Sequence, residues 1–166
     1  MECSKEEGQV MYELTIERIE SRGVTIKQIA ELTHYLQGPY DDLTIEFCIE
    51  NVLAVLQKRE VQNAVLTGIK LDELAEQNLL EGPLQDMVEN DHSLYGIDEI
   101  LAFSIINVYG SVAFTNYGYI DKVKPGILKE IDALGKGTNV CNTFLDDLIG
   151  AIAAASASRI AHRKNI

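Results

Sequence analysis

Residues 100–120, ILAFSIINVYGSVAFTNYGYI, form an unbroken stretch of 21 uncharged residues between Glu99 and Asp121. A helix of this length can cross a bilayer. Small and polar residues nevertheless interrupt it: Ser104, Asn107, Gly110, Ser111, Thr115, Asn116 and Gly118. Acidic residues also stand at both ends. We therefore expect a buried central helix of a soluble protein, over about 96–116, rather than a membrane span.

A second apolar stretch, LDDLIGAIAAASASRIAHR at 145–163, is rich in Ala and Ser and belongs to a helix expected over about 140–162. Apolar residues recur at helical spacing elsewhere, and strand-like alternation is hard to find. Further helices are expected over about 7–21, 25–36, 43–66, 68–79, 82–90 and 126–134, with Thr25 as a cap and Gly68 and Gly82 as breaks. No repeat or linker divides the chain. The predicted fold is all-α, a single compact multi-helix bundle comprising residues 1–166.

The charge of this 166-residue chain is strongly acidic and unevenly distributed. It holds 26 Asp and Glu against 14 Lys and Arg, a net charge of −12. Residues 1–99 hold 21 acids and 7 bases, whereas residues 100–166 hold 5 acids and 7 bases. Such acidity excludes a nucleic-acid binder, which needs a basic face. It also disfavours docking onto anionic lipid by charge alone.

The cysteines and the N-terminus indicate a cytoplasmic protein. Cys3, Cys48 and Cys141 form no pair or Cys/His cluster, so neither disulfides nor a zinc site are expected. Residues 1–7 show no basic and apolar pattern of a signal peptide. The basic C-terminal end is the one candidate for peripheral contact with the inner face of a membrane: Arg159, His162, Arg163 and Lys164.

Two pairs of adjacent acids open the most apolar helices, Asp98-Glu99 and Asp146-Asp147. Neighbours on a helix stand about 100° apart, so the two members of a pair cannot point the same way. A buried carboxylate needs a partner of opposite charge or a hydrogen-bond donor. One divalent cation shared by both pairs is the simplest partner that would serve all four acids. Oxygen ligands suit Mg²⁺. The alternative stays open that these acids only cap helices and interact with their dipoles.

Other charged residues give weaker signals. Lys122 and Lys124 precede the helix that Pro125 opens and can hold a phosphate, or simply belong to a solvated loop. The i,i+4 acids Glu46/Glu50 and Asp72/Glu76 are expected on solvated faces.

Three ordered blocks of this sequence resemble the phosphatidylglycerophosphatase A family, in particular its shorter, soluble branch from Gram-positive bacteria. They are Asp91–Glu99 (DHSLYGIDE), Tyr119–Pro125 (YIDKVKP) and Phe144–Ala151 (FLDDLIGA), within a region of about 91–153. The resemblance implies an Mg²⁺-dependent phosphatase that converts phosphatidylglycerophosphate to phosphatidylglycerol. It further implies a set of site residues: Asp98, Glu99 and Asp147 in catalysis, the same three with Asp146 as metal ligands, and Asp121 and Lys124 near the phosphate.

Two departures from the family pattern concern the site. Gly118 stands where membrane-bound members carry an arginine, and their early Pro-Gly-Thr segment has no equal here. Loss of a guanidinium that stabilises transition-state charge raises the free energy of the transition state by about 2–5 kcal/mol. We take as a hypothesis that Arg59 supplies this charge from another helix and binds substrate.

Three functions remain for comparison. The first is an Mg²⁺-dependent phosphatase acting on phosphatidylglycerophosphate or a related phosphomonoester, with a phosphate ester or phospholipid headgroup as its partner. The second is a non-enzymatic helical module that binds metal or phospholipid, or that oligomerises. The small residues over 150–158 allow close packing, either within one chain or in a homo-oligomer. The third, an all-α nucleotide pyrophosphohydrolase, requires a Glu-Glu-x-x-Glu run that is absent.

Overall fold

The computed structural model describes residues 5–38, 42–135 and 138–163, and over these residues it contains helices and no strands. The α-helices, which confirm the all-α prediction, are α1 Lys5–Ser21, α2 Ile26–Gln37, α3 Ile45–Leu56, α4 Arg59–Glu76, α5 Pro83–Glu89, α6 Ile97–Ile106, α7 Ser111–Val123, α8 Ile127–Leu134 and α9 Leu145–Arg163. A short 3-10 helix, η1 (Asn107–Tyr109), joins α6 to α7.

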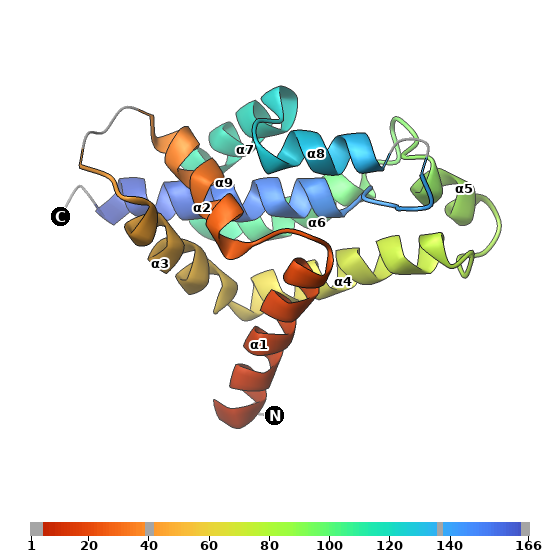
Figure 1. The fold of residues 1–166 in the computed structure, drawn as a ribbon, viewed down its shortest axis with the longest axis horizontal. Helices are drawn as coiled ribbons and strands as arrows, with labels where there is room; N and C mark the ends of the chain where they lie inside the picture. The colour runs from red at the N-terminus through yellow and green to blue at the C-terminus, as the bar shows by residue number, and fades with distance from the viewer. Residues whose placement is uncertain (1–4, 39–41, 136–137, 164–166) are drawn as a thin grey trace.

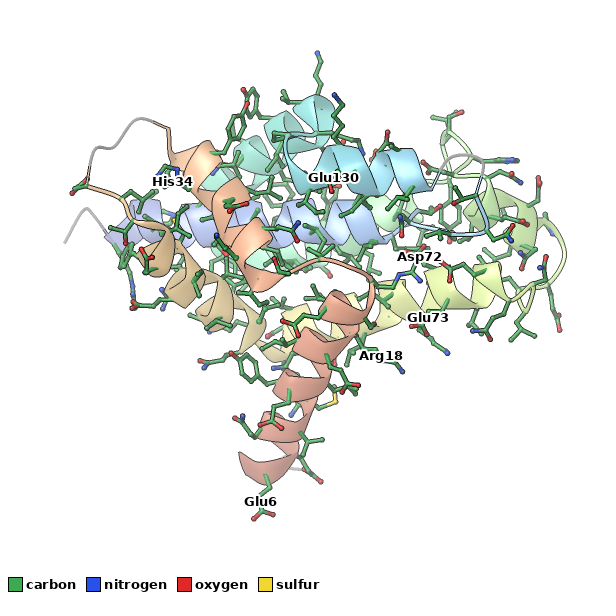
Figure 2. The ribbon with its side chains drawn as sticks, viewed as in Figure 1. Glu6, Arg18, His34, Asp72, Glu73 and Glu130 are labelled. Atoms are coloured by element: carbon green, nitrogen blue, oxygen red, sulfur yellow. The ribbon has the colours of Figure 1, made fainter. Side chains whose placement is uncertain are left out.

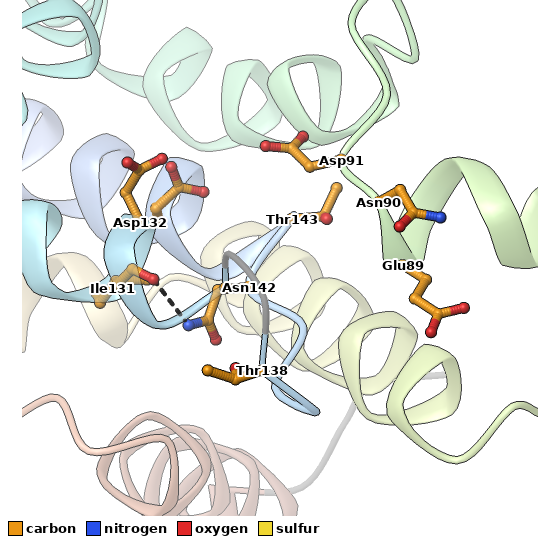
Figure 3. Close-up of a pocket in the computed structure, with 10 residues that line it drawn as sticks. Glu89, Asn90, Asp91, Ile131, Asp132, Thr138, Asn142 and Thr143 are labelled. Atoms are coloured by element: carbon orange, nitrogen blue, oxygen red, sulfur yellow. Dashed lines mark hydrogen bonds between the residues drawn. The ribbon is translucent and has the colours of Figure 1, made fainter.

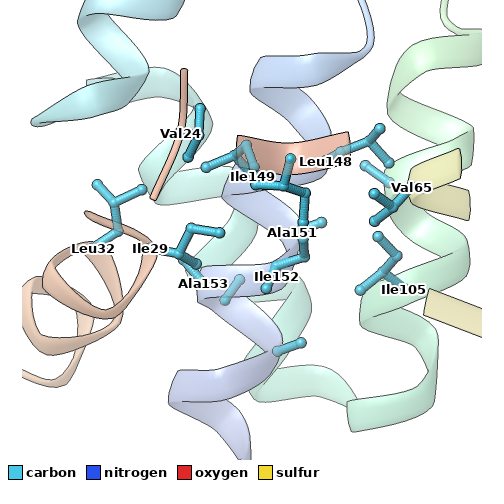
Figure 4. Packing of buried hydrophobic residues seen from close by; sticks show 14 of the residues in the cluster. Val24, Ile29, Leu32, Val65, Ile105, Leu148, Ile149, Ala151, Ile152 and Ala153 are labelled. Carbon is cyan, nitrogen blue, oxygen red and sulfur yellow. The ribbon is translucent and has the colours of Figure 1, made fainter. Parts of the chain in front are cut away.

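The central helix of the fold is α9, which runs through the middle of the molecule with other helices around it (Figure 1). Nearly all of its side chains from Leu145 to Ile160 are buried. Its Ala and Ser residues let neighbouring helices approach closely, and Figure 4 shows this packing around Ile149 and Ile152. Gln37 of α2 donates a hydrogen bond to the Ala157 carbonyl of α9 (2.7 Å). The expected central helix within 100–120 is thus replaced by α9.

The uncharged stretch 100–120 folds as two helices instead of one. α6 ends at Ile106, and Gly110 then adopts a positive φ of 78° before α7 begins at Ser111. A positive φ is readily available only to glycine, so the chain turns here. The expected continuous helix over 96–116 is wrong. In the part of the chain that the structure describes, no helix is long and apolar enough to cross a membrane.

Two further helix boundaries differ from those expected. The helix predicted over 43–66 breaks after Leu56, whose carbonyl accepts a hydrogen bond from the Gln62 side chain (2.9 Å). α4 then continues through Gly68, which was expected to end a helix. A Cβ at Gly68 would lie 2.6 Å from the Leu148 side chain, so the glycine is there for close packing against α9. The predicted cap at Thr25 is confirmed, because its hydroxyl accepts from the Gln28 N–H.

Candidate functional site

The start of α9 is anchored by a carboxylate from another helix. The backbone N–H groups of Phe144 and Leu145 donate to the two oxygens of Asp72, each at 3.0 Å. Asp72 is fully buried on α4. A carboxylate is favourable at a helix N-terminus, where backbone N–H groups have no partner within the helix. Asp72 therefore sets the position from which the first turn of α9 projects.

A second anchor holds the segment that leads into α9. Arg22, just after α1, forms two hydrogen bonds with Glu76 (2.6 and 3.0 Å) and donates to the Cys141 carbonyl (2.6 Å). The Cys141 N–H in turn donates to Glu76 (2.8 Å). The expectation that Asp72 and Glu76 lie on a solvated face is therefore wrong: both hold the approach to α9. Glu73, which follows Asp72 on α4, instead forms a part-exposed ion pair with Arg18 (3.3 Å; Figure 2).

A cluster of three carboxylates forms where α7 ends and α9 begins. Asp121, Asp146 and Asp147 each offer a carboxylate oxygen, and these oxygens all lie within 4.8 Å of one another. Lys124, which follows α7, forms ion pairs with Asp121 (3.3 Å) and with Asp146. The fold thus brings together four of the predicted site residues, three from α7 and α9 and one at the position that follows α7.

Burial and mutual repulsion raise the pKa of the carboxylates in this cluster. For Asp147 the main cause is burial, followed by the charges of Asp146, Asp121 and Asp98, and its pKa rises to about 9. Burial also raises the pKa of Asp146 to about 6, against the opposing effect of Lys124. Burial lowers the pKa of Lys124, but Asp146 and Asp121 outweigh it and hold the pKa above its usual range. The cluster therefore carries more negative charge than one ammonium group offsets.

Asp98 and Tyr117 complete the surroundings of Asp147. Asp98, on the first turn of α6, is half-buried, and burial together with the charge of Asp91 raises its pKa. One of its carboxylate oxygens is buried without a hydrogen-bond partner. The buried Tyr117 of α7 lies beside Asp147, and its hydroxyl likewise makes no well-formed hydrogen bond.

Not every predicted site residue joins this cluster. Glu99 is exposed on the outside of α6, and Lys122 is exposed on α7. Glu99 is not among the carboxylates whose oxygens can hold one ion, so the two acid pairs do not converge as complete pairs. Asp146 and Asp147 both belong to the cluster, whereas of the first pair only Asp98 lies near it.

Arg59 lies at the wrong end of α4 to replace the family arginine. It is the first residue of α4, and Asp72 follows thirteen residues later, about 20 Å along the helix axis. Burial raises the pKa of Tyr109, and the charge of Glu60, the residue after Arg59, adds to this shift. The Tyr109 carbonyl accepts a hydrogen bond from Ser158, so this end of α4 lies near the second half of α9, whereas the cluster lies at its start. An arginine side chain cannot span this distance, so Arg59 does not supply the missing charge. Gly118 faces open space, with no atom near its missing Cβ.

A polar cleft of about 380 Å³ opens beside Asp146 (Figure 3). The residues that line it are Glu89, Asn90, Asp91, Ile131, Asp132, Gly135, Thr138, Asn142, Thr143 and Asp146. In Figure 3 the carboxylates of Asp91 and Asp132 extend into it from opposite sides. Its volume is within the range of small-molecule sites. Asp91 was not among the expected site residues, although it belongs to the first block of the family resemblance.

Comparison with known proteins settles the family. The family model described as phosphatidylglycerophosphatase A matches residues 19–162. The chain belongs to the phosphatidylglycerophosphatase A family. It is 63% identical over 147 residues to YutG, an uncharacterized protein of Bacillus subtilis strain 168, which covers 88% of this chain and 87% of YutG.

Solved structures of relatives share the whole fold. A protein of unknown function from Bacillus stearothermophilus is 61% identical with a TM-score of 0.88, over 92% of this chain and 94% of that one. The low temperature requirement C protein from Listeria monocytogenes is 54% identical with a TM-score of 0.90, over 94% of this chain and 98% of that one. The family membership suggests a phosphatase.

Proposed function

We propose that this protein is a divalent-cation-dependent phosphoric monoester hydrolase that acts on phosphatidylglycerophosphate or a related phosphomonoester at the cytoplasmic side. The observation that carries the proposal is the cluster of Asp121, Asp146 and Asp147, with oxygens within 4.8 Å, next to Lys124. Family membership points to the same chemistry.

The cluster has the chemistry of a site for Mg²⁺ or a similar cation. Its three candidate ligands are hard carboxylate oxygens from two rigid helices. Burial raises the pKa values of Asp146 and Asp147, and the charges of Asp146 and Asp121 add to the shift of Asp147, so a bound cation would favour the ionised carboxylates. Asp121, Asp146 and Asp147 would hold the cation. When bound, it would neutralise phosphate oxygens and make a water molecule more acidic.

The protein's own side chains supply the remaining functions. Lys124 is held at the cluster by Asp121 and Asp146, so its ammonium group can orient one phosphate oxygen. Asp98 lies near Asp147 but outside the trio, and its raised pKa and unpartnered oxygen suit a base that takes a proton from water. The fully buried side chains around α9 keep bulk water from the inner side of the cluster.

Phosphate release with a matched variant tests this function. The protein is incubated with Mg²⁺ and with phosphatidylglycerophosphate, glycerol phosphate or p-nitrophenyl phosphate, and inorganic phosphate is measured. We expect Mg²⁺-dependent release that Asp147→Asn reduces at least about a hundredfold. Asp86→Asn, at an exposed position on α5, is the control and should retain full activity. Folded protein that releases no phosphate from any ester of the panel contradicts the proposal.

The second candidate function is binding without catalysis, in a family member that has lost turnover. It is favoured by the open space at Gly118 and by the distance of Arg59 from the cluster, which leave the family's guanidinium position empty. A non-catalytic protein of this kind would bind a divalent cation and a phosphate headgroup without releasing phosphate. Cation binding measured by calorimetry beside the phosphate assay separates the two functions.

A further inference from the structure

Exposed large apolar side chains are concentrated in one part of the sequence. Of the thirteen that the structure describes, eight lie within residues 94–123. These eight are Leu94, Ile97, Ile100, Val108, Val112, Phe114, Tyr119 and Val123. Single exposed apolar residues are ordinary on any protein, whereas a local concentration marks a surface that meets an apolar partner.

Three of them form what we call the apolar ridge: Leu94, Ile97 and Ile100, with 101%, 51% and 59% of their surfaces exposed. Ile97 and Ile100 are three residues apart, so they share one side of α6, and Leu94 stands in the loop directly before it. One turn further along α6, Phe103 contacts Phe114 of α7, with ring centroids 5.6 Å apart. The apolar surface therefore continues from the loop to α7.

The backbone at Leu94 is held in an unfavourable conformation. Its φ is +70°, in the left-handed region that leucine rarely occupies. Its side chain is also fully exposed, so it contributes no burial to the fold. Two unfavourable features at one residue do not stabilise the isolated protein. They are explained if the side chain enters an apolar phase when the protein binds its partner.

We propose that the apolar ridge inserts into the acyl-chain region of a phospholipid bilayer, beside the carboxylate cluster. Leu94 follows by three residues Asp91, which lines the cleft beside Asp146, and Asp98 on the first turn of α6 is near Asp147. The loop before α6 and the first turn of α6 therefore connect the ridge to the candidate site for a cation and a phosphate, which complements an amphiphile with a phosphate headgroup. The identity of that headgroup rests on the proposed function, but the ridge itself does not.

The charge of the protein determines how such binding depends on salt. The chain has a net charge of −12, and the exposed Glu99 is the sequence neighbour of Ile100 in the ridge. Electrostatic attraction to an anionic membrane is therefore absent, and attachment comes from apolar burial. A fluid acyl layer accommodates a fully protruding leucine without a preformed hollow, which a second copy of this chain would need to provide. Binding should consequently persist at high salt.

Vesicle flotation tests the ridge directly. The full-length protein is mixed with phosphatidylcholine vesicles that contain a minor fraction of phosphatidylglycerol, at low and at high salt. Leu94→Asn with Ile100→Gln removes the apolar side chains without adding charge, and asparagine tolerates a positive φ. The matched control is Val10→Gln with Leu79→Asn, at sites that are 63% and 60% exposed elsewhere. We expect the ridge variant to bind vesicles at least tenfold more weakly, and the control to bind like the wild type.

Two results would overturn the inference. One is equal binding, or absence of binding, for all three proteins. The other is a wild-type dimer that the ridge variant dissociates in sedimentation without any vesicle binding, which would make a second copy the occupant. Hydrolysis of soluble p-nitrophenyl phosphate, measured in parallel, should be the same for wild type and ridge variant. If hydrolysis is absent while flotation behaves as expected, the proposed function fails and the membrane surface remains.

Discussion

At the scale of single residues, Asp147 is the side chain most altered by its surroundings. It is 6% exposed and adjoins three further carboxylates, and its pKa rises to about 9. An acid whose pKa is raised by folding binds protons more tightly in the folded state. Without a cation, the contribution of Asp147 to stability is therefore greatest at low pH and is lost as pH rises from about 4 toward about 9.

Cation binding should reverse this loss, because the ion takes the place of the protons on Asp146 and Asp147. We expect Mg²⁺ to raise the melting temperature more at pH 9 than at pH 6. Asp147→Asn should abolish most of this dependence, whereas Asp86→Asn should keep it. Differential scanning calorimetry at both pH values, with and without Mg²⁺, provides the measurement. An equal Mg²⁺ effect at the two pH values would contradict the assignment of Asp147 as a ligand.

Gly118 offers a gain-of-function experiment. It lies one turn before Asp121 on α7 and has open space where a side chain would project. Gly118→Arg would place a guanidinium near the cluster, and we expect faster phosphate release from phosphomonoesters, by up to about a hundredfold. Gly118→Ala is the control, since both variants should stabilise the helix by about 0.5–1 kcal/mol. Equal rates in the two variants would show that the arginine position has no role here.

The residues found from sequence and those missed differ in the kind of signal they carry. Asp98, Asp146 and Asp147 stand out because they begin apolar helices, and Asp121 and Lys124 because they belong to an ordered block. Asp72 follows no apolar run and so resembles other acids of this acidic chain, although its spacing from Val65, Gly68 and Ile69 places it on the buried side of α4. Its burial is decided by residues 72 and 73 positions later, whose N–H groups it accepts. Sequence spacing cannot predict that contact.

At the scale of secondary structure, the beginning of α9 determines the site. Asp72 binds its first N–H groups, and Arg22 with Glu76 holds the segment before it. We expect Asp72→Asn to destabilise the fold by about 1–3 kcal/mol, because the amide nitrogen cannot accept from the second N–H group. Chemical denaturation gives this value, with Asp86→Asn as control. A change below about 0.5 kcal/mol would mean that Asp72 does not hold α9.

Helix packing makes a second prediction at this scale. A Cβ at Gly68 would lie 2.6 Å from the Leu148 side chain, so Gly68→Ala should overpack α4 against α9 and cost about 1–3 kcal/mol. Gly8→Ala, on α1 where nothing lies within 4 Å, should instead be neutral or stabilising. Thermal unfolding of both variants compares them directly. Equal melting temperatures would contradict the close packing of these two helices.

The accuracy of the predicted helix bounds depends on what ends each helix. The bounds of α1, α2, α5 and α8 come close to those expected, because local caps and turns such as Thr25 and Gly82-Pro83 mark them. The breaks after Leu56 and at Gly110 were missed. The first follows from packing against different neighbours, and a single glycine inside an apolar run does not reveal the second. Likewise α9, not 100–120, is central, because small side chains rather than high hydropathy allow helices on several sides.

At the scale of the whole molecule, a strongly acidic protein is proposed to bind a phosphate. Residues 1–99, with 21 acids and 7 bases, carry a net charge of −14, and residues 100–166, with 5 acids and 7 bases, carry +2, yet Asp121, Asp146 and Asp147 lie in the second part. Without a cation these three carboxylates would repel a phosphate dianion, and Lys124 alone does not offset them. The central claim is therefore that the cluster holds a divalent cation.

Anomalous diffraction from crystals soaked in Mn²⁺ tests this claim most directly. We predict a peak at about 2.1 Å from carboxylate oxygens of Asp121, Asp146 and Asp147, which Asp147→Asn crystals should lack. Crystals that bind no Mn²⁺ at this position, with Lys124 still paired to Asp121 and Asp146, would contradict the account.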